Sequence, residues 1–577
     1  MRRVPATFVL LLLSSGVGAI AVSGAPKPPD QARTMSEVID RVITNENKSI
    51  QQIRQYSPLV ETYIQNQKAD KDLGSVPAGD KYFLGRADFS KGVALVSLTD
   101  TDTKGKKIFG AIGNFFSFSA QFIPGGFLQM IFIDTNGFDQ QHYKFDYVRQ
   151  EFLGEVRCLV FDVTPLEKAG KGRFLGRVWV EDQDYNIVRF NGGYSGNGHS
   201  SWYFHFDSWR TNVQPGLWLP SFVYSQESDL HYAISKKLNF RAQTRLWGYN
   251  LGHAGQEQEL SKILIETPVQ DETKTANDLT PLQAQRSWDR QAEDNVMDRF
   301  ERIGLMAPKG EVDKVLDTVV NNLEVTNNID VDPEVRCRVL TTSTLESFTI
   351  GHTIVLSRGL IDVLPDEASL ATILAHELGH VVLAHRMDPA YGFFDNLLVE
   401  DRDTFRHFGF ARTPAEEDAA NKKASELLAN ALKDAQVAKS WQLTNATLFF
   451  QTLQTRQKEI PNLISGHLGN RVPVIADLKS SASASAADPK QNAQMIAALP
   501  IGGRVKLDPW NDKLEMIKSK PIGTVAEREK MPFEVTPFMP YLTRFGAEAT
   551  KPIAASAAAP SETKAPDAAP SKPQPEK

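Results

Sequence analysis

The pattern of apolar and polar positions divides the N-terminal half of the chain into two regions. From about residue 35 to 70, apolar residues recur at helical spacing in a polar background, which predicts a helical segment within residues 26–80. From residue 81 to 268, short alternating runs rich in aromatic residues are separated by Gly, Asp and Asn. Such evenly spaced runs predict one antiparallel sheet or open barrel. The clearest runs are residues 177–181 and 185–190, expected as a hairpin, then 202–206, 217–219, 222–224 and 238–247.

One stretch of this β-rich region, Phe109 to Ile133, is unusually apolar and rich in phenylalanine. Aromatic stripes usually fill protein cores, so we expect it to form the core side of two strands. The alternative is a hydrophobic pocket, or a surface that meets lipid or unfolded protein.

The C-terminal half changes to helical periodicity after a polar linker at residues 269–285. Apolar residues between Val312 and Leu323 predict an amphipathic helix. Short strands are expected at residues 335–340 and 352–357, followed by helices to about residue 457. We therefore expect a mainly helical domain over residues 286–470, with a small sheet. A C-terminal extension follows at residues 471–545, with a flexible insertion at Ser480–Ala487, and residues 546–577 form an Ala/Pro-rich tail that is expected to be disordered.

The first 25 residues have the pattern of an export signal. Arg2 and Arg3 precede an apolar stretch from Val4 to Val22, and Ser23-Gly24-Ala25 supplies small residues, so cleavage is expected after Ala25. The alternative is an uncleaved membrane anchor, because the stretch is close to the shortest length that spans a bilayer. The expected location is the periplasm or cell envelope.

Composition narrows the classes of partner. The 577 residues have a net charge of -6 and 41% hydrophobic residues. This charge gives no reason to expect nucleic acid as a partner. The two cysteines, Cys158 and Cys337, fit neither a disulfide framework nor a thiolate metal site, so buried free thiols are expected.

The most informative motif is His376-Glu377-Leu378-Gly379-His380, within an apolar run of helical period. Residues four apart lie on one face of a helix, so His376 and His380 can bind one metal ion together. Glu377 would lie beside that metal, where it can take a proton from water. The motif predicts a zinc metallopeptidase with one Zn²⁺ per chain and Glu377 as the catalytic residue. The alternative is a buried helix with two structural histidines.

A zinc peptidase needs a third protein ligand, and Glu417 is the best candidate. Thr413, Pro414 and Glu416 have the pattern of a helix start with a capping box, which occupies Glu416. Glu417 shares the apolar face of that helix, where a carboxylate needs a partner such as a metal on a neighbouring helix. The alternative is a salt-bridged surface residue.

These motifs, in this order, resemble family forty-eight of the metallopeptidases, the group of HtpX, the periplasmic BepA-type proteases and the CAAX prenyl proteases. The resemblance covers about residues 300 to 470 and rests on residues 353–361, 371–380 and 417–421. It implies zinc held by His376, His380 and Glu417, endopeptidase activity with Glu377 as base and acid, and a substrate that adds as a strand along a sheet edge near residues 352–357.

Two features depart from this family. Asn421 stands where the family usually has Asp, and a neutral outer partner for a ligand histidine is expected to weaken the site about 10–100-fold. The membrane spans of HtpX and the prenyl proteases are absent from the sequence, which favours the exported BepA type.

His385, five residues after His380, would lie on the opposite side of a continuing helix from His376 and is not expected to be a ligand.

His467 and Arg471 are candidates for stabilising the transition state, since a developing oxyanion needs a positive or hydrogen-bonding partner. The alternative is a structural loop held by Arg471 salt bridges.

The overall prediction is an α+β protein: an antiparallel, half-barrel-like β domain followed by a mainly helical zincin-type protease domain with a small edge sheet. The order of a helix followed by a sheet in this region loosely resembles the half-barrels of lipoprotein carriers of the LolA type. The predicted function is an exported zinc metalloendopeptidase that acts on protein or peptide substrates, with envelope quality control as a role and peripheral contact with membrane or lipoproteins. The alternatives are an exported binding protein whose metal site has degenerated and a lipid or lipoprotein carrier.

Overall fold

In this computed structural model, the structure describes residues 34–70, 74–90, 93–98, 124–170, 172–195, 204–227, 240–249, 281–385, 408–434, 437–438, 441, 443–469, 505–508, 513–516 and 541–546. The predicted signal segment, Arg471, the Ser480–Ala487 insertion, the tail after residue 546 and residues 109–123 of the Phe-rich stretch lie outside this part of the chain. Within the described residues, no helix is long and apolar enough to span a bilayer.

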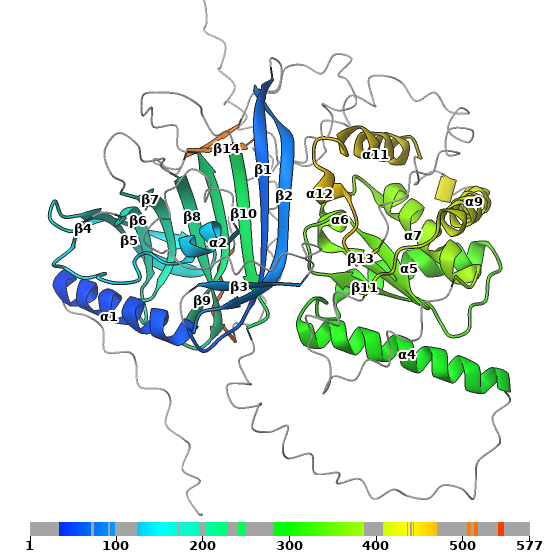
Figure 1. The fold of residues 1–577 in the computed structure, drawn as a ribbon, viewed down its shortest axis with the longest axis horizontal. Coiled ribbons are helices and arrows are strands. Elements are labelled where there is room, and N and C mark those ends of the chain that lie inside the picture. The colour runs from blue at the N-terminus through cyan, green and yellow to red at the C-terminus, as the bar shows by residue number, and fades with distance from the viewer. Residues whose placement is uncertain are drawn as a thin grey trace, which may run out of the picture.

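A strongly curved antiparallel sheet of ten strands forms the N-terminal part of the molecule (Figure 1). Its spatial order is β3-β2-β1-β10-β9-β8-β7-β6-β5-β4, so the first strand pairs with the last one. The predicted hairpin is present as β6 paired with β7. The strands are β1 Leu59–Asp70, β2 Gly74–Asp88, β3 Ala94–Ser97, β4 Tyr143–Leu153, β5 Val156–Pro165, β6 Phe174–Glu181, β7 Ile187–Tyr194, β8 Phe204–Gln214, β9 Leu217–Glu227 and β10 Phe240–Trp247.

The predicted helical segment is correct only in its first half. Helix α1 spans Met35–Ile53, and the hydroxyl of Thr34 caps it by accepting a hydrogen bond from the Glu37 N–H at 3.2 Å. Residues 59–70 form strand β1 instead of continuing the helix. Pro58 disfavours a helical conformation for the residue before it, and the β-branched and aromatic residues after it favour a strand.

The apolar interior of the curved sheet is covered by α1 and by a short helical segment, α2 Pro124–Leu128 with the 3₁₀ helix η1 Gln129–Ile131. Phe127, Leu128 and Ile131 are buried there together with α1 residues such as Val42. The Phe-rich stretch is thus buried core where it is described. The expectation of two strands is wrong for this part, because Pro124 and two glycines favour a turn and a helix start over a strand.

The C-terminal part is mainly helical around a small sheet (Figure 1). That sheet has the order β11-β13-β12, so β13 is its central strand. Helix α4 begins at Pro281, inside the stretch predicted as linker. The elements are α4 Pro281–Ile303, α5 Glu311–Thr326, β11 Arg336–Leu340, β12 Ser347–Ile350, β13 Thr353–Ser357, α6 Arg358–Val363, α7 Glu367–Val382, α9 Pro414–Ala431, α11 Leu443–Arg456 and α12 Pro461–Ile464, with a separate hairpin of β14 Val505–Asp508 and β15 Lys513–Met516.

Buried hydrogen bonds join the large sheet to the helical part. The Glu61 carboxylate on β1, only 1% exposed, accepts bonds from the Ser343 N–H and hydroxyl, both at 2.7 Å, and from the Tyr82 hydroxyl at 2.9 Å. Arg245 on β10 donates to the same carboxylate at 3.0 Å. Ser343 lies in the loop between β11 and β12, so the sheet directly supports the loop that leads into β12.

Candidate metal centre

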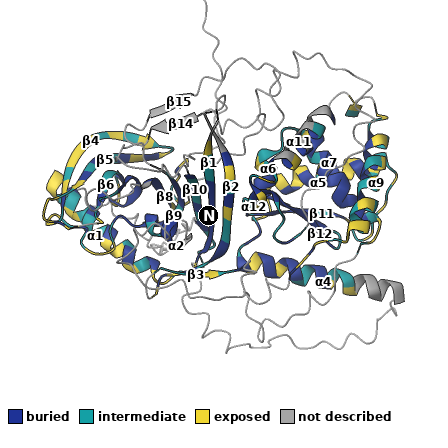
Figure 2. Ribbon diagram, turned by 45° about the horizontal axis from the view of Figure 1, so that its top comes forward, coloured by how far each residue is buried: buried dark blue, intermediate teal, exposed yellow. Residues whose placement is uncertain are grey.

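Helix α7 is buried along nearly its whole length, which Figure 2 shows as a dark blue helix between α5, α9 and α11. Its N-terminus is capped by Asp366, whose carboxylate accepts from the Ser369 N–H at 2.9 Å. Burial places His376, Glu377 and His380 inside the protein at 2–3% exposure. Polar side chains at such depth require partners.

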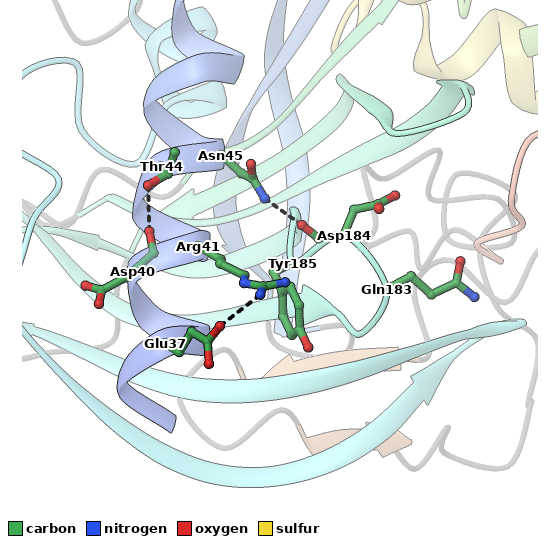
Figure 3. A pocket seen from close by; sticks show the side chains of 8 residues that line it. All are labelled: Glu37, Asp40, Arg41, Thr44, Asn45, Gln183, Asp184 and Tyr185. Carbon is green, nitrogen blue, oxygen red and sulfur yellow. Dashed lines mark hydrogen bonds and ion pairs between the residues drawn. The ribbon is translucent and has the colours of Figure 1, made fainter. Parts of the chain in front are cut away.

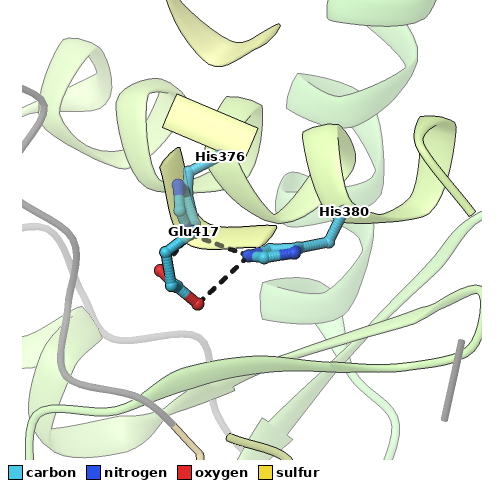
Figure 4. A group of neighbouring side chains, drawn as sticks. All are labelled: His376, His380 and Glu417. Atoms are coloured by element: carbon cyan, nitrogen blue, oxygen red, sulfur yellow. Dashed lines mark hydrogen bonds and ion pairs between the residues drawn. The ribbon is translucent and has the colours of Figure 1, made fainter. Parts of the chain in front are cut away.

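The partner comes from α9. Helix α9 begins with the predicted capping box, in which Thr413 and Glu416 bond each other's backbone N–H. Glu417 follows in the first turn, and its carboxylate reaches both histidines of α7 (Figure 4). Its side chain is 20% exposed, while Ala420 and Ala424 on the same face are buried. The capping box thus determines which of two adjacent glutamates is available to a metal.

Three potential ligand atoms converge at this point. The Nε2 atoms of His376 and His380 are 3.1 Å apart, and the Glu417 carboxylate oxygens lie 3.3 Å and 3.4 Å from them. All three residues belong to one group of side chains able to hold a metal ion. Two imidazole nitrogens and a carboxylate that face one another so closely are a donor set for one small cation.

Each ligand histidine is held by an outer partner. His376 Nδ1 lies 3.0 Å from Asn421 Oδ1, and His380 Nδ1 lies 2.8 Å from His385 Nδ1. With the Nε2 lone pairs directed at a metal, each Nδ1–H donates to its partner, which fixes the orientation of the ring. Burial, assisted by the neighbouring His380, lowers the pKa of His385 and so favours the neutral ring that can accept this bond.

His385 lies outside the metal group, as expected, but the helical geometry predicted for it is wrong. Helix α7 ends at Val382, and Ala384 adopts a left-handed conformation with φ 55°. The chain therefore turns back, so that His385 contacts His380. The helical periodicity of the sequence did not predict that α7 ends at Val382.

The structure adds Arg412, which the sequence did not single out, to the surroundings of this centre. Its guanidinium Nη2 donates to the Thr349 hydroxyl of β12 at 2.8 Å. Burial lowers the pKa of the Arg412 guanidinium, and the carboxylates of Glu377, Glu416 and Glu417 partly offset that shift.

His467 is not brought to the metal group. Its ring packs on Tyr82 of β2 with centroids 4.6 Å apart, and its Nε2 lies 3.0 Å from the Asn462 carbonyl oxygen. Its backbone N–H donates to Glu346 at 2.9 Å. These contacts place His467 at the junction with the large sheet. Arg471, its companion in the sequence prediction, lies outside the described residues.

A separate hollow of about 350 Å³ lies between α1 and the turn that joins β6 to β7 (Figure 3). Glu37, Arg41 and Tyr185 line it, and the Arg41 guanidinium lies 5.5 Å from the Tyr185 ring centroid as well as bonding Glu37. Arg41 pairs with Glu37 at 2.9 Å, and Asp40 and Asp184 add two further carboxylates to the lining. It shares no residue with the metal group.

Comparison with known families places the metal group in a defined class. Residues 309–450 match the model of peptidase family M48, and this stretch contains His376, His380 and Glu417. The match confirms the resemblance seen in the sequence and shows that the chain carries a metallopeptidase domain. No curated protein matches the chain.

Three solved structures are similar to part of the chain. A LolA superfamily protein from Nitrosomonas europaea has 12% identity, covers 38% of this chain and 93% of its own, and gives a TM-score of 0.21. An outer membrane lipoprotein-sorting protein domain from Vibrio parahaemolyticus has 8% identity, with 39% and 98% covered and a TM-score of 0.22. A DUF1329 family protein from Desulfovibrio piger has 11% identity, with 37% and 94% covered and a TM-score of 0.23. The first of them is of the LolA type that the β region resembles in sequence, and a likeness at these TM-scores carries no weight for function.

Proposed function

We propose that this protein is a zinc-dependent metalloendopeptidase. The observation that supports this proposal is the spacing of 3.1–3.4 Å among the potential ligand atoms of His376, His380 and Glu417. Tetrahedral zinc with bonds of about 2.0–2.1 Å separates its ligand atoms by about 3.3 Å. Two imidazoles and one carboxylate are also the ligand set of catalytic zinc, which leaves a fourth position for water or substrate.

When bound, zinc polarises a peptide carbonyl and lowers the pKa of a water molecule. Glu377 directly follows the buried ligand His376 on α7 and is itself buried. It takes the proton of the attacking water, and the water oxygen bonds to the carbonyl carbon. As the C–N bond breaks, Glu377 passes that proton to the leaving amine.

The substrate strand is proposed to lie along β12. The earlier expectation of an edge near residues 352–357 is wrong, because β13 lies between β11 and β12 in the sheet. Strand β12 contacts α7 and forms one edge of this sheet. A peptide that adds to β12 gains backbone hydrogen bonds without any sequence requirement, which suits an endopeptidase for protein substrates.

The proposed setting is the bacterial periplasm or envelope, where such an enzyme would remove damaged or unfolded proteins. The support is the export-signal pattern of the first 25 residues. The large sheet would bind the substrate or a membrane-associated partner such as a lipoprotein.

A second candidate function is an exported binding protein with a degenerate metal site. Asn421 favours it, because a neutral amide next to His376 is a weaker outer partner than the carboxylate usual in this family. The intact His376-Glu377-His380 set favours catalysis.

Zinc content and turnover together test the proposal. Purified residues 26–577 are expected to bind about one zinc per chain, and Glu417→Gln is expected to lose most of it because a neutral amide replaces the anionic ligand. Metal analysis after dialysis measures both. Glu377→Gln is expected to keep the zinc and lose hydrolysis of fluorescein-labelled casein. Absence of zinc from the wild type at saturating zinc would favour the binding protein.

A further inference from the structure

Strand β4 forms one edge of the ten-stranded sheet. Within the part of the chain that the structure describes, β5 pairs with one side of β4 and no strand pairs with the other. The strand lies at the end of the sheet that is far from the peptidase part (Figure 1), and much of it is exposed (Figure 2). Tyr147, Val148 and Phe152 are 46%, 37% and 67% exposed. An open edge presents backbone N–H and C=O groups that can pair with another chain, so β4 is a candidate interaction surface.

The outward backbone groups of β4 follow from its hairpin with β5. The pair next to the two-residue turn of this hairpin, Leu153 and Val156, exchanges backbone hydrogen bonds, and every second pair back from the turn does the same. Gln150 and Phe152 lie between these pairs, so their N–H and C=O groups point away from β5. Phe145 pairs with a β5 residue of the same alternate series and has the same orientation. A further strand would add on this side.

Four charged side chains of alternating sign lie on one face of β4. The register with β5 shifts at a bulge between Tyr147 and Arg149. Asp146 pairs with Asp162 and Arg149 with Val160, so residues three apart across the bulge share a face. The resulting row of alternating positive and negative residues is Lys144, Asp146, Arg149 and Glu151. Within one chain, the first two of these pair at 2.9 Å and the last two at 2.6 Å.

This row of charges is complementary to itself. In an antiparallel pair of β4 strands centred on the bulge, Asp146 lies opposite Arg149 of the second copy, and the two outer charges of the row likewise face each other. Opposed residues of an antiparallel pair share a face, which holds here because each strand carries the bulge. The backbone agrees with this register, since Gln150 lies opposite Phe145 of the second copy and both have outward backbone groups. Every charge then gains a partner of opposite sign across the contact.

We propose that β4 is the contact between two copies of this chain, joined as antiparallel strands about a two-fold axis between Tyr147 and Val148. Such a contact requires a patch that matches itself, and the charge row supplies it. A bulge and charged side chains ordinarily protect an edge from pairing, but here both fall at positions that a second β4 accommodates. The contact also brings the exposed ring of Phe152 against Tyr143 of the second copy. The proposal concerns assembly and does not depend on the peptidase function.

Charge variants test the contact by sedimentation equilibrium over a range of protein concentrations. Asp146→Lys is expected to weaken the dimer about tenfold, because two attractive pairs become repulsive. Combining it with Arg149→Asp restores opposite charges and is expected to recover most of the loss. Glu311→Lys makes the same change of charge on α5, where the side chain is 87% exposed, and is the control that should leave the dimer unchanged. A wild type that stays monomeric, or no recovery in the double variant, would overturn the proposal.

Cysteine cross-linking tests the register without relying on charge. Asp146→Cys and Arg149→Cys are purified separately and mixed under mild oxidation. In the proposed register these residues face each other with Cα atoms about 4.5 Å apart, which suits a disulfide, so the mixture is expected to form linked dimers. Either variant alone holds its cysteines about 10 Å apart along the strands and is expected to stay unlinked.

Wild type is the control for this cross-linking, because Cys158 and Cys337 are both buried. Each mixed dimer keeps one ion pair between Asp146 and Arg149, so the contact itself should survive both substitutions. No linkage in the mixture, or equal linkage in the mixture and in the separate variants, would overturn the proposal.

Discussion

At the scale of single residues, the outer partners of the two histidines set the strength of the metal centre. Asn421 Oδ1 lies 3.0 Å from His376 Nδ1, where a neutral amide oxygen receives the ring N–H. His380 has an even less usual partner in His385 at 2.8 Å. Neither partner carries a negative charge when His385 is neutral. The basicity of both ligand rings is therefore lower than in a site with carboxylate partners.

Asn421→Asp is expected to tighten zinc binding about 10–100-fold, because a carboxylate accepts the His376 N–H in a charge-assisted bond. Competition with a fluorescent zinc chelator measures the affinity. Asn421→Ala is the matched control and should weaken binding, since it removes the acceptor. Unchanged affinity in Asn421→Asp would show that the amide already serves the site fully.

At the scale of elements, the site depends on how closely α7 and α9 approach. They meet at Gly379, where an added Cβ would lie 3.0 Å from the Ala420 carbonyl oxygen and 3.4 Å from Lys423 Cβ. Gly379 lies between the two ligand histidines, and Ala420 between Glu417 and Asn421. The absence of a side chain at residue 379 thus lets α9 present both of these residues to α7.

Gly379→Ala is expected to weaken zinc binding about tenfold by pushing Glu417 and Asn421 away from the histidines. The contact is with backbone, which cannot rotate aside. Alanine favours the helix by about 1 kcal/mol, so thermal stability is expected to change less than metal affinity. Chelator competition and a circular-dichroism melt measure the two effects separately. Zinc affinity equal to wild type would show that α9 adjusts without cost.

At the scale of the whole molecule, the large sheet and the peptidase part are one packed structure at their junction. The Glu61 carboxylate joins β1, β2 and β10 to Ser343, just ahead of β12. Asp80 on β2 likewise accepts from the backbone N–H groups of Asn462 and Leu463 at 3.0 and 2.8 Å. Strand β12, proposed to receive the substrate, is thus supported from the sheet.

Glu61→Ala is expected to lower the free energy of unfolding by about 3 kcal/mol, because it leaves Arg245 and Ser343 without their buried acceptor. The melting temperature, followed by tryptophan fluorescence, is expected to fall. The rate of casein hydrolysis is expected to fall as well. Glu311→Ala is the matched control, since Glu311 pairs with Lys314 on the surface with both side chains more than 70% exposed. An unchanged melting temperature in Glu61→Ala would contradict structural dependence between the two parts.

The features that the sequence predicted correctly depend on residues that lie close together in the chain. The spacing of His376 and His380, the capping box that occupies Glu416 and leaves Glu417, and the alternation in most of the sheet depend on neighbours a few residues apart. Such features are read directly from the chain. The antiparallel sheet and the ligand set were predicted for this reason.

Only the tertiary structure decided the contacts between residues far apart in sequence. It placed β13 in the middle of its sheet, turned His385 back onto His380, directed His467 to the large sheet and brought Arg412 to β12. These outcomes depend on which surfaces pack together, and no periodicity or cap encodes that choice. The sequence by itself determined the chemistry of the metal ligands, and the packing of α7, α9 and β12 decided what surrounds them.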